Sequence, residues 1–330
     1  MGLAPNALDP HVELLLRRDL SGAYPVVEGI PILLAPEMIA AKDYSYAVDK
    51  AHPKYAEAYA EMQFYEQAAR QEFADLHGSE SYRAVAPCAA TTEAQRAAFP
   101  APISTWLVDA PYDCAAQWDA YSHIAPVQQQ RVMQLGGKGV HAVKFLIAGA
   151  AEAWNVTPML SEARFAMRLA AEFGVADRLH CVVGIAEELP FPDDVFNIVF
   201  SGGCIHHTIT SISMPEINRV LRSGGRFGAV DPWRAPLYAI GTRVFGKREA
   251  NPFCRPLTAE RIAPVFSAFA EARIIQHGAL TRYPILALSK LGVHTPLSWV
   301  WQINRIDDAI SSLAAPLRRA GSSVALLGTK

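Results

Sequence analysis

The stretch RVMQLGGKG, residues 131–139, has the pattern of a buried β-strand that runs directly into a glycine-rich turn. Beyond it, short β-rich runs alternate with amphipathic helical segments, which is typical of β-α-β units in a parallel sheet. This alternation predicts an α/β fold. We expect strands at 131–135, 153–157, 179–184, 197–201, 225–231, 272–277 and 322–328, and helices from the glycine turn to about 148, at 161–173 with Ser161 as N-cap, and after residue 257.

Two segments precede this α/β region. Residues 1–50 contain a short stretch at 12–16 that we expect to be helical, and then YPVVEGIPILL (24–34), whose mixture of turn formers and β-formers predicts a small hairpin. Residues 51–125 carry aromatic residues at helical spacing and predict a helical cap or lid. The α/β domain would then span 126–330, with a helical insertion at about 283–320.

The composition excludes several classes of protein. With 30 basic and 32 acidic residues the formal net charge is −2, which disfavours a nucleic-acid partner. A hydrophobic content of 51% argues against disorder. The longest apolar runs fall well short of the ~20 residues that span a bilayer, and the first twenty residues lack the apolar core of a signal peptide. We therefore expect a cytoplasmic protein with a small-molecule substrate and no membrane partner.

Five widely spaced cysteines, with no CxxC pair, suggest neither a disulfide framework nor a structural zinc site. The functional site should instead lie outside the carboxyl ends of the parallel strands. There the glycines of residues 136–139 would let backbone amides approach an anionic group. This loop matches neither the Walker phosphate loop nor the dinucleotide fingerprint, so ATP, GTP and NAD are poorly supported.

Three stretches carry a resemblance to a known family: VMQLGGKG (132–139), ADRLHCVVGIAEELPFPDDVFNIVFSGGCIHH (176–207) and INRVLRSGGRF (217–227). Together they resemble the class I S-adenosylmethionine-dependent methyltransferases, in particular the small-molecule, quinone-biosynthesis-like branch. The resemblance covers about residues 120–277. It implies a Rossmann-like seven-stranded sheet with helices on both faces and an antiparallel last strand, and S-adenosylmethionine as cofactor. The 24–34 run also resembles the end of a zinc ribbon, here a remnant without its cysteines.

The resemblance also places the cofactor, although several of its contacts depart from the family pattern. Gln134 and Thr157 stand where acidic residues are usual, Lys138 where a glycine is usual, and Ile185 where an aspartate is common. Because a hydrogen bond to a charged group is worth ~1.5 to 3 kcal/mol, losing two or three would weaken binding by about a hundredfold or more. Lys138 could compensate by pairing with the cofactor carboxylate. The cofactor-binding residues implied are Gln134, Gly136, Gly137, Lys138, Gly139, Thr157, Ile185, Ala186, Ser201 and Cys204.

Two histidines are candidate catalytic residues. His207 follows the strand at 197–201, His141 follows the glycine loop, and a neutral imidazole could act as a general base there. A metal held by these two with Cys204 and His206 is an alternative, but no pair has the i, i+4 helical spacing, and we predict no metal. Expected substrate-binding residues are Tyr112, His206, Asp231, Trp233, Tyr238 and Arg255; Tyr112 would belong to a lid with Trp118 and Tyr121.

Three functions remain open from the sequence. The first is methyl transfer from S-adenosylmethionine to a small metabolite, for which the protein supplies chiefly proximity and orientation. The second is a repurposed methyltransferase fold that catalyses a cyclisation, elimination or rearrangement, which the neutral contact positions favour. The third is an inactive subunit that stabilises a partner. The chain could also form a homodimer.

Overall fold

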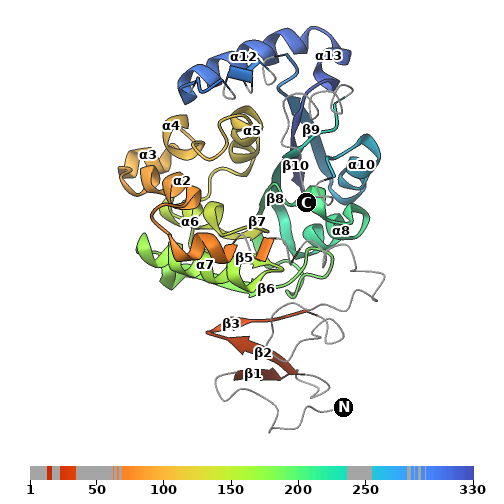
Figure 1. Ribbon diagram of the computed structural model, residues 1–330. Helices are drawn as coiled ribbons and strands as arrows, with labels where there is room; N and C mark the ends of the chain where they lie inside the picture. Colours follow the sequence, from red (N-terminus) through yellow and green to blue (C-terminus); the bar gives the residue numbers. More distant parts are fainter. Residues whose placement is uncertain are drawn as a thin grey trace.

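The computed structural model describes residues 13–16, 23–34, 62, 65–66, 69–235, 255–280, 284–285, 287–288, 291–293 and 295–330. Figure 1 shows a central sheet flanked by helices, with a small separate sheet near the amino terminus. The strands are β1 (Glu13–Leu16), β2 (Ala23–Val27), β3 (Ile30–Pro31), β4 (Arg131–Leu135), β5 (Glu152–Thr157), β6 (Leu179–Val183), β7 (Phe196–Gly202), β8 (Leu221–Pro232), β9 (Glu271–His277) and β10 (Ser323–Thr329).

The α-helices in the described ranges lie before, between and after the strands of the large sheet. They are α2 (Glu80–Ala89), α3 (Glu93–Ala97), α4 (Ile103–Trp106), α5 (Cys114–Ile124), α6 (Val140–Ile147), α7 (Leu160–Glu172), α8 (Thr210–Val220), α10 (Ala259–Ala268), α12 (Leu297–Ser312) and α13 (Ala315–Arg319). None of these helices is both long and apolar enough to cross a bilayer.

The large sheet has seven strands in the order β6-β5-β4-β7-β8-β10-β9. Strands β4 to β8 pair in parallel, whereas β10 is antiparallel to both β8 and β9. The predicted α/β fold with an inserted antiparallel last strand is confirmed. The chain leaves β4 toward β5 on one side and later returns to β7 on the other side, so the strand order reverses at β4. In open α/β sheets the ligand-binding crevice lies outside the carboxyl ends of the strands at such a reversal.

The expected helix at 12–16 is wrong. Residues Glu13 to Leu16 form β1, which pairs antiparallel with β2 so that Glu13 faces Val26. A helix of so few residues would be marginal, and the hairpin partner satisfies the backbone instead. The chain then continues to Ile32, which bridges to Val183 at the edge of β6, so the small sheet extends the exposed edge of the large one.

The start of α7 also differs from expectation. The N-cap is Met159 and the helix begins at Leu160, one residue before the predicted cap Ser161. Ser161 lies inside the first turn, where its amide donates to Glu66 Oε2 and its hydroxyl donates to the Glu66 carbonyl. The serine is therefore used to bind the preceding helical region to α7 rather than to cap the helix.

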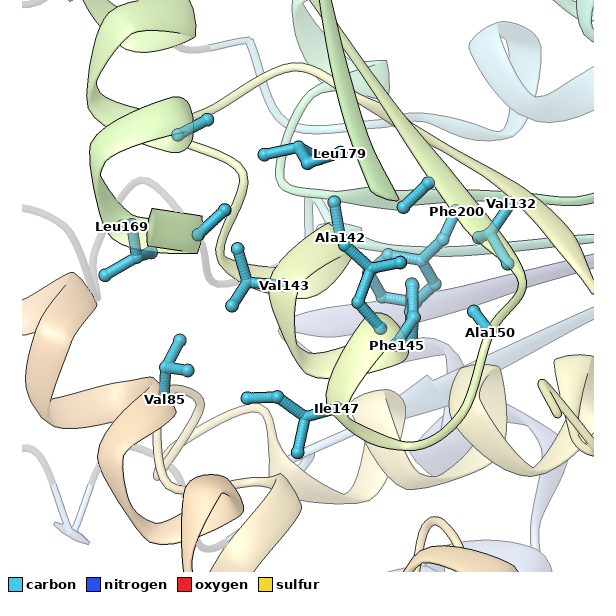
Figure 2. Packing of buried hydrophobic residues seen from close by; sticks show 14 of the residues in the cluster. Val85, Val132, Ala142, Val143, Phe145, Ile147, Ala150, Leu169, Leu179 and Phe200 are labelled. Atoms are coloured by element: carbon cyan, nitrogen blue, oxygen red, sulfur yellow. The ribbon is translucent and has the colours of Figure 1, made fainter. Parts of the chain in front are cut away.

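Helix α6 lies between the sheet and the helices that precede it. Figure 2 shows Val143 and Ile147 of α6 near Val85 of α2, and Phe145 beside Phe200 of β7. The Phe145 and Phe200 rings lie 5.4 Å apart edge to face. A second buried cluster covers the other face of the sheet under α8 and α10. Both faces are thus packed, as a parallel sheet requires.

A buried histidine connects three elements at the far edge of the sheet. His277 ends β9, and its ring nitrogens bond Asp119 of α5 at 3.0 Å and Asp308 of α12 at 2.7 Å. Burial opposes the charged imidazole, but the hydrogen bonds to the two carboxylates prevail and raise the pKa of His277 to about 9. The imidazolium therefore holds α5 and α12 against the sheet.

This bridge predicts a loss of stability in alkali. An imidazole with a pKa of 6.5 when unfolded and about 9 when folded contributes stability in full below pH 6.5, and this stability is lost as pH rises through about 9. The loss is about 3 kcal/mol of unfolding free energy. We expect urea unfolding at a series of pH values to show it, and His277→Gln to flatten the profile between pH 6.5 and 9. An equally steep decline in the variant would contradict the bridge.

Candidate functional site

A cavity of about 180 Å³ opens at the carboxyl ends of β4, β5, β6 and β7, where the strand order reverses. This is the place at which open α/β sheets bind ligands. The lining residues come from the four loops that follow these strands and from the helical region before α2. They are Met62, Tyr65, Leu135, Gly136, Gly137, Val156, Pro158, Met159, Glu162, Gly184, Ile185, Ala186, Glu187, Gly202, Gly203, Cys204, His207 and Thr208.

The glycine loop between β4 and α6 forms one wall of this cavity. Gly136, Gly137 and Gly139 all have positive φ, at 73°, 73° and 76°. A Cβ on Gly136 would lie 2.6 Å from Cys204 Sγ, and one on Gly139 would lie 2.4 Å from the Cβ of Ala166. Gly136 and Gly137 face the cavity, whereas Gly139 packs against α7. The sequence prediction for Gly136 and Gly137 thus corresponds to residues at the cavity wall.

Gln134 holds this loop in place. Its amide nitrogen donates to the Gly136 carbonyl at 2.8 Å, and its amide oxygen accepts from the Ala142 amide at 2.7 Å. A carboxylate could accept the second bond but could not donate the first. The glutamine therefore stabilises the turn and the first turn of α6, and it lines an adjoining cavity rather than the one beside Cys204.

The end of β5 carries a buried carboxyl that the sequence analysis missed. Thr157 is fully buried, and its hydroxyl donates to Glu162 Oε2 at 2.5 Å. Glu162 itself lines the cavity from the first turn of α7. Burial raises the pKa of Glu162 to about 7, against the opposing effect of the Thr157 hydrogen bond. Glu162 therefore supplies a carboxyl group beside the neutral Thr157 at the end of β5.

Lys138 pairs with an acidic residue outside this cavity. Its ammonium nitrogen lies 2.5 Å from Glu72 Oε1, in the helical region before α2, and it lines the adjoining cavity of about 610 Å³. This pairing joins the glycine loop to the preceding helical region. The proposed pairing of Lys138 with an anionic ligand would have to compete with Glu72.

Residues that follow β6 and β7 form further parts of the wall. Ile185, Ala186, Cys204 and His207 all line the cavity, and His207 Nε2 lies 3.5 Å from the Tyr65 hydroxyl. Ser201 does not reach the cavity: it is fully buried in β7. The predicted cofactor contacts at Ile185, Ala186 and Cys204 therefore lie together.

His206, unlike His207, does not line the cavity at the strand reversal. Its Nδ1 and its backbone amide both bond Asp231 Oδ1, at 2.8 and 3.0 Å, and its carbonyl accepts from Arg261 at 2.7 Å. These contacts tie the loop after β7 to the end of β8. His206 lines neither of the two cavities above, and it is also absent from a third, of about 260 Å³, which Asp231 lines.

A polar network around Asp109, which includes the buried Lys144, borders both the second and the third cavity. Asp109 pairs with the fully buried Lys144 ammonium and accepts from Gln117 at 3.3 Å, and His141 Nε2 lies 3.8 Å from Asp109 Oδ2. Burial favours the neutral acid, but Lys144 and His141 outweigh it, and the pKa of Asp109 lies below its ordinary value. Asp109 is therefore ionised at neutral pH.

His141 faces both of these cavities from the start of α6. Its Nδ1 bonds the Tyr121 hydroxyl at 2.6 Å. Burial lowers the pKa of His141 to about 4, although Asp109 acts in the other direction. The imidazole is neutral near pH 7 and can exchange hydrogen bonds with a ligand. His141 and His207 thus line different cavities, and these share Gly137 and the Gly202–Gly203 turn.

Those remaining predicted substrate residues that the structure describes do not line any of these three cavities. Tyr112 is half-buried beside the apolar core, and Trp233 is buried with its indole nitrogen donating to the Arg319 carbonyl at 3.2 Å. Arg255 is exposed, and Tyr238 lies outside the described residues. Of the other two proposed lid residues, Tyr121 is fully buried and Trp118 packs on Trp301 at 5.3 Å.

Metal coordination receives no geometric support from the described part of the chain. No three of its histidine, cysteine or acidic side chains form a group that could hold an ion. In particular, Cys204 and His207 border one cavity, His141 borders two others, and His206 bonds Asp231.

Sequence reasoning missed Glu162, Asp109 and Lys144. A signal existed for Glu162, because it stands in the first turn of the helix after a strand, where acids are favoured. Lys144 also stood out as a lone charge in the apolar run VHAVKFLI. Asp109 had no comparable signal, since its partner lies 35 residues away in the chain.

The glycine loop yields a test of its packing. Gly136→Ala should lower the unfolding free energy by about 1 to 3 kcal/mol more than Gly224→Ala does, since overpacking against Cys204 adds to the backbone cost. Gly224 is a matched control because its φ is 72° and a Cβ added there would have no neighbouring atom within 4 Å in the described part of the chain. Urea denaturation measures both. Equal losses in the two variants would contradict the close approach of Cys204.

Comparisons with known proteins agree with this architecture. Residues 136–229 match the family model described as a methyltransferase domain. The chain is 35% identical over 82 residues to a probable phthiotriol/phenolphthiotriol dimycocerosates methyltransferase 2 of Mycobacterium ulcerans, covering 22% of this chain and 32% of the relative. It is 32% identical over 104 residues to the uncharacterized methyltransferase YcgJ of Bacillus subtilis, covering 31% and 41%. The matches thus span less than half the length of either relative.

Among solved structures, the geranyl diphosphate C-methyltransferase of Streptomyces coelicolor superposes with a TM-score of 0.54. It covers 85% of this chain and 99% of its own, at 14% identity, and was crystallised with Mg²⁺, geranyl diphosphate and S-adenosyl-L-homocysteine. At that identity the likeness concerns the fold alone. Residues 136–229 thus match a methyltransferase domain family, and the seven-stranded sheet with its antiparallel last strand is the fold that this chain shares with the solved methyltransferase.

Proposed function

We propose that this protein transfers a methyl group from S-adenosylmethionine to a small-molecule acceptor. The observation that carries the proposal is the cavity at the strand reversal, which has the glycine loop on one wall and the buried Glu162 carboxyl on another. S-adenosylmethionine, when bound, supplies an electrophilic methyl group on a sulfonium centre. The chain's own residues would bind the cofactor, orient the acceptor and exclude water from the site.

The residues around the cavity fit this cofactor. Glu162 offers a carboxylate that could accept from ribose hydroxyls, in place of the family acid that Thr157 replaces. Gly136 and Gly137 line the cavity, and neither carries a side chain of its own. Ile185 and Ala186 supply an apolar surface suited to an adenine ring. Gln134 stands where family members usually have an acidic residue. Here its amide stabilises the glycine loop through hydrogen bonds to Gly136 and Ala142.

The acceptor would occupy the second and third cavities. They meet the cofactor cavity at Gly202, which lines all three, and the His141 ring packs directly on this glycine. A Cβ on Gly202 would lie 2.3 Å from His141 Nε2, so the glycine leaves room for the imidazole beside the shared wall. Neutral His141 would then orient an acceptor hydroxyl or amine, and ionised Asp109 would favour a hydrogen-bond donor there.

The two alternative functions, a repurposed enzyme and an inactive subunit, differ from methyl transfer in which ligand this cavity would bind. A repurposed enzyme would bind S-adenosylmethionine without consuming it, or bind another ligand. An inactive subunit would bind neither. Calorimetric titration with S-adenosylmethionine and S-adenosylhomocysteine separates a protein that binds the cofactor from an inactive subunit or an enzyme with another ligand, and we expect binding of both; formation of S-adenosylhomocysteine during turnover then separates methyl transfer from an enzyme that binds the cofactor without consuming it. No heat from either nucleoside up to millimolar concentration would overturn the proposal.

Glu162 provides a sharper test through pH. Since the pKa of Glu162 is about 7 in the folded protein, its carboxylate forms as pH rises through 7. Affinity for S-adenosylhomocysteine should therefore increase from pH 6 to pH 8. Glu162→Gln should weaken binding at pH 8 by roughly 10- to 100-fold, the worth of a charged hydrogen bond, and remove most of the pH dependence.

Glu172→Gln is the matched control for this titration. Glu172 ends the same helix, is exposed and pairs with His77 at 2.8 Å, outside the cavity. Its replacement should leave both the affinity and its pH dependence unchanged. If Glu162→Gln behaved like Glu172→Gln, the carboxyl would have no part in binding the nucleoside.

A further inference from the structure

Helix α12 buries several polar residues and exposes several large apolar ones. Its buried positions are Val300, Asn304, Asp307 and Ser311, which recur at i, i+4, i+7 and i+11 and of which three are polar. The exposed large apolar residues are Trp299, Ile306 and Ile310, followed by Leu313 at its end and by Leu317 on α13. We refer to these five residues as the outward apolar face. Figure 1 shows α12 and α13 along one rim of the molecule.

The buried polar residues are fully used within the chain. Asn304 donates to the Val300 carbonyl at 2.8 Å and reaches Cys114 Sγ at 3.7 Å. Asp307 accepts from the Leu280 amide at 3.0 Å and from the Ser311 hydroxyl at 3.0 Å. These contacts fix which side of the helix faces inward. The outward apolar face is therefore held at the surface by specific hydrogen bonds.

The outward face is also large for a solvent-exposed surface. Trp299 is 67% exposed and Leu313 is 85% exposed. Their spacing gathers them on one side of the helix, about two turns apart or less from each neighbour. Contiguous apolar patches of this kind on soluble proteins usually mark an interaction site.

The charges around this face are of one sign. Within Leu297–Arg319 the charged residues are Arg305, Asp307, Asp308, Arg318 and Arg319. The three arginines are exposed, whereas Asp307 is buried and Asp308 bonds His277. Arg305 keeps one weak contact to Asp308, at 3.9 Å. The rim of the outward apolar face is therefore positive.

We propose that the outward apolar face of α12 and α13 docks on the surface of an anionic lipid bilayer. An apolar stripe with an indole and flanking arginines is the composition of a helix that lies in the headgroup region, with the apolar side chains inserted and the cations beside lipid phosphates. Such docking needs no spanning helix, so it is compatible with the absence of one among the described helices.

A second copy of the chain fits this face less well. Symmetric pairing would bring the arginines of both copies to the same interface, and the segment Leu297–Arg319 has no exposed acid to meet them. Like charges brought together oppose association. The bilayer supplies the missing negative charge.

Co-sedimentation of the full chain with vesicles tests the proposal. We expect binding to phosphatidylcholine vesicles that contain a third of phosphatidylglycerol, weaker binding to phosphatidylcholine alone, and release by high salt. The double variant Ile306→Asn/Leu313→Asn should bind at least about tenfold more weakly, since each side chain loses its insertion. Arg318→Gln/Arg319→Gln should cost about fivefold for each arginine, for anionic vesicles only.

Phe266→Ser is the matched control, because Phe266 on α10 is 56% exposed and lies outside the proposed surface. It should leave vesicle binding unchanged. All these side chains are exposed, so the variants should keep the thermal midpoint of the parent.

Failure of the parent to bind anionic vesicles would overturn the proposal, as would unchanged binding by the double variant. A dimer in solution that Ile306→Asn/Leu313→Asn dissociates, without vesicle binding, would identify a second copy as the occupant instead.

Discussion

The close approach of Cys204 to Gly136 leaves no room for a side chain at position 136, in the turn between β4 and α6. The same turn is closed on its other side by Ala166 of α7, against Gly139. Only glycine combines the positive φ of these positions with such contacts. Because β4 and β7 neighbour each other at the strand reversal, this one turn sets how close their loops come. The cavity, the position of Glu162 and the start of α6 all depend on it.

Three buried ionisable groups are accommodated by different surroundings. Lys144 would be costly to bury alone, but Asp109 and the Trp106 carbonyl accept its hydrogen bonds. Glu162 is bonded to the neutral Thr157 hydroxyl, and its raised pKa reflects burial that this bond only partly offsets. His277 lies at the opposite extreme, between two carboxylates. The pKa values of Glu162 and His277 are therefore both raised, by burial for Glu162 and by hydrogen bonds to two carboxylates for His277.

Helix α12 connects these interior contacts to the surface. Its inward side is held by the His277 bridge and by the hydrogen bonds of Asn304 and Asp307, and this leaves Trp299 and Leu313 outside. An ordinary amphipathic helix would have placed its apolar residues inward. The hydrogen-bonding polar residues decide which side of the helix faces inward. An unpaired carboxylate in the interior costs more free energy than burying a leucine there would gain.

The α/β fold and the strand boundaries within a few residues were predictable from the amino-acid sequence, since alternation of β-rich runs with helices is a local property of the chain, whereas the antiparallel last strand was implied by the family resemblance. So was the placing of the glycine loop, Ile185, Ala186, Cys204 and His207, which follow strands whose carboxyl ends meet at one edge. Three-dimensional packing was needed to establish that Gln134 braces the loop, that Glu162 stands in for Thr157, and that Lys138 pairs with Glu72. Those roles depend on contacts between segments packed together in space, and no periodicity along the chain encodes which side chain reaches which.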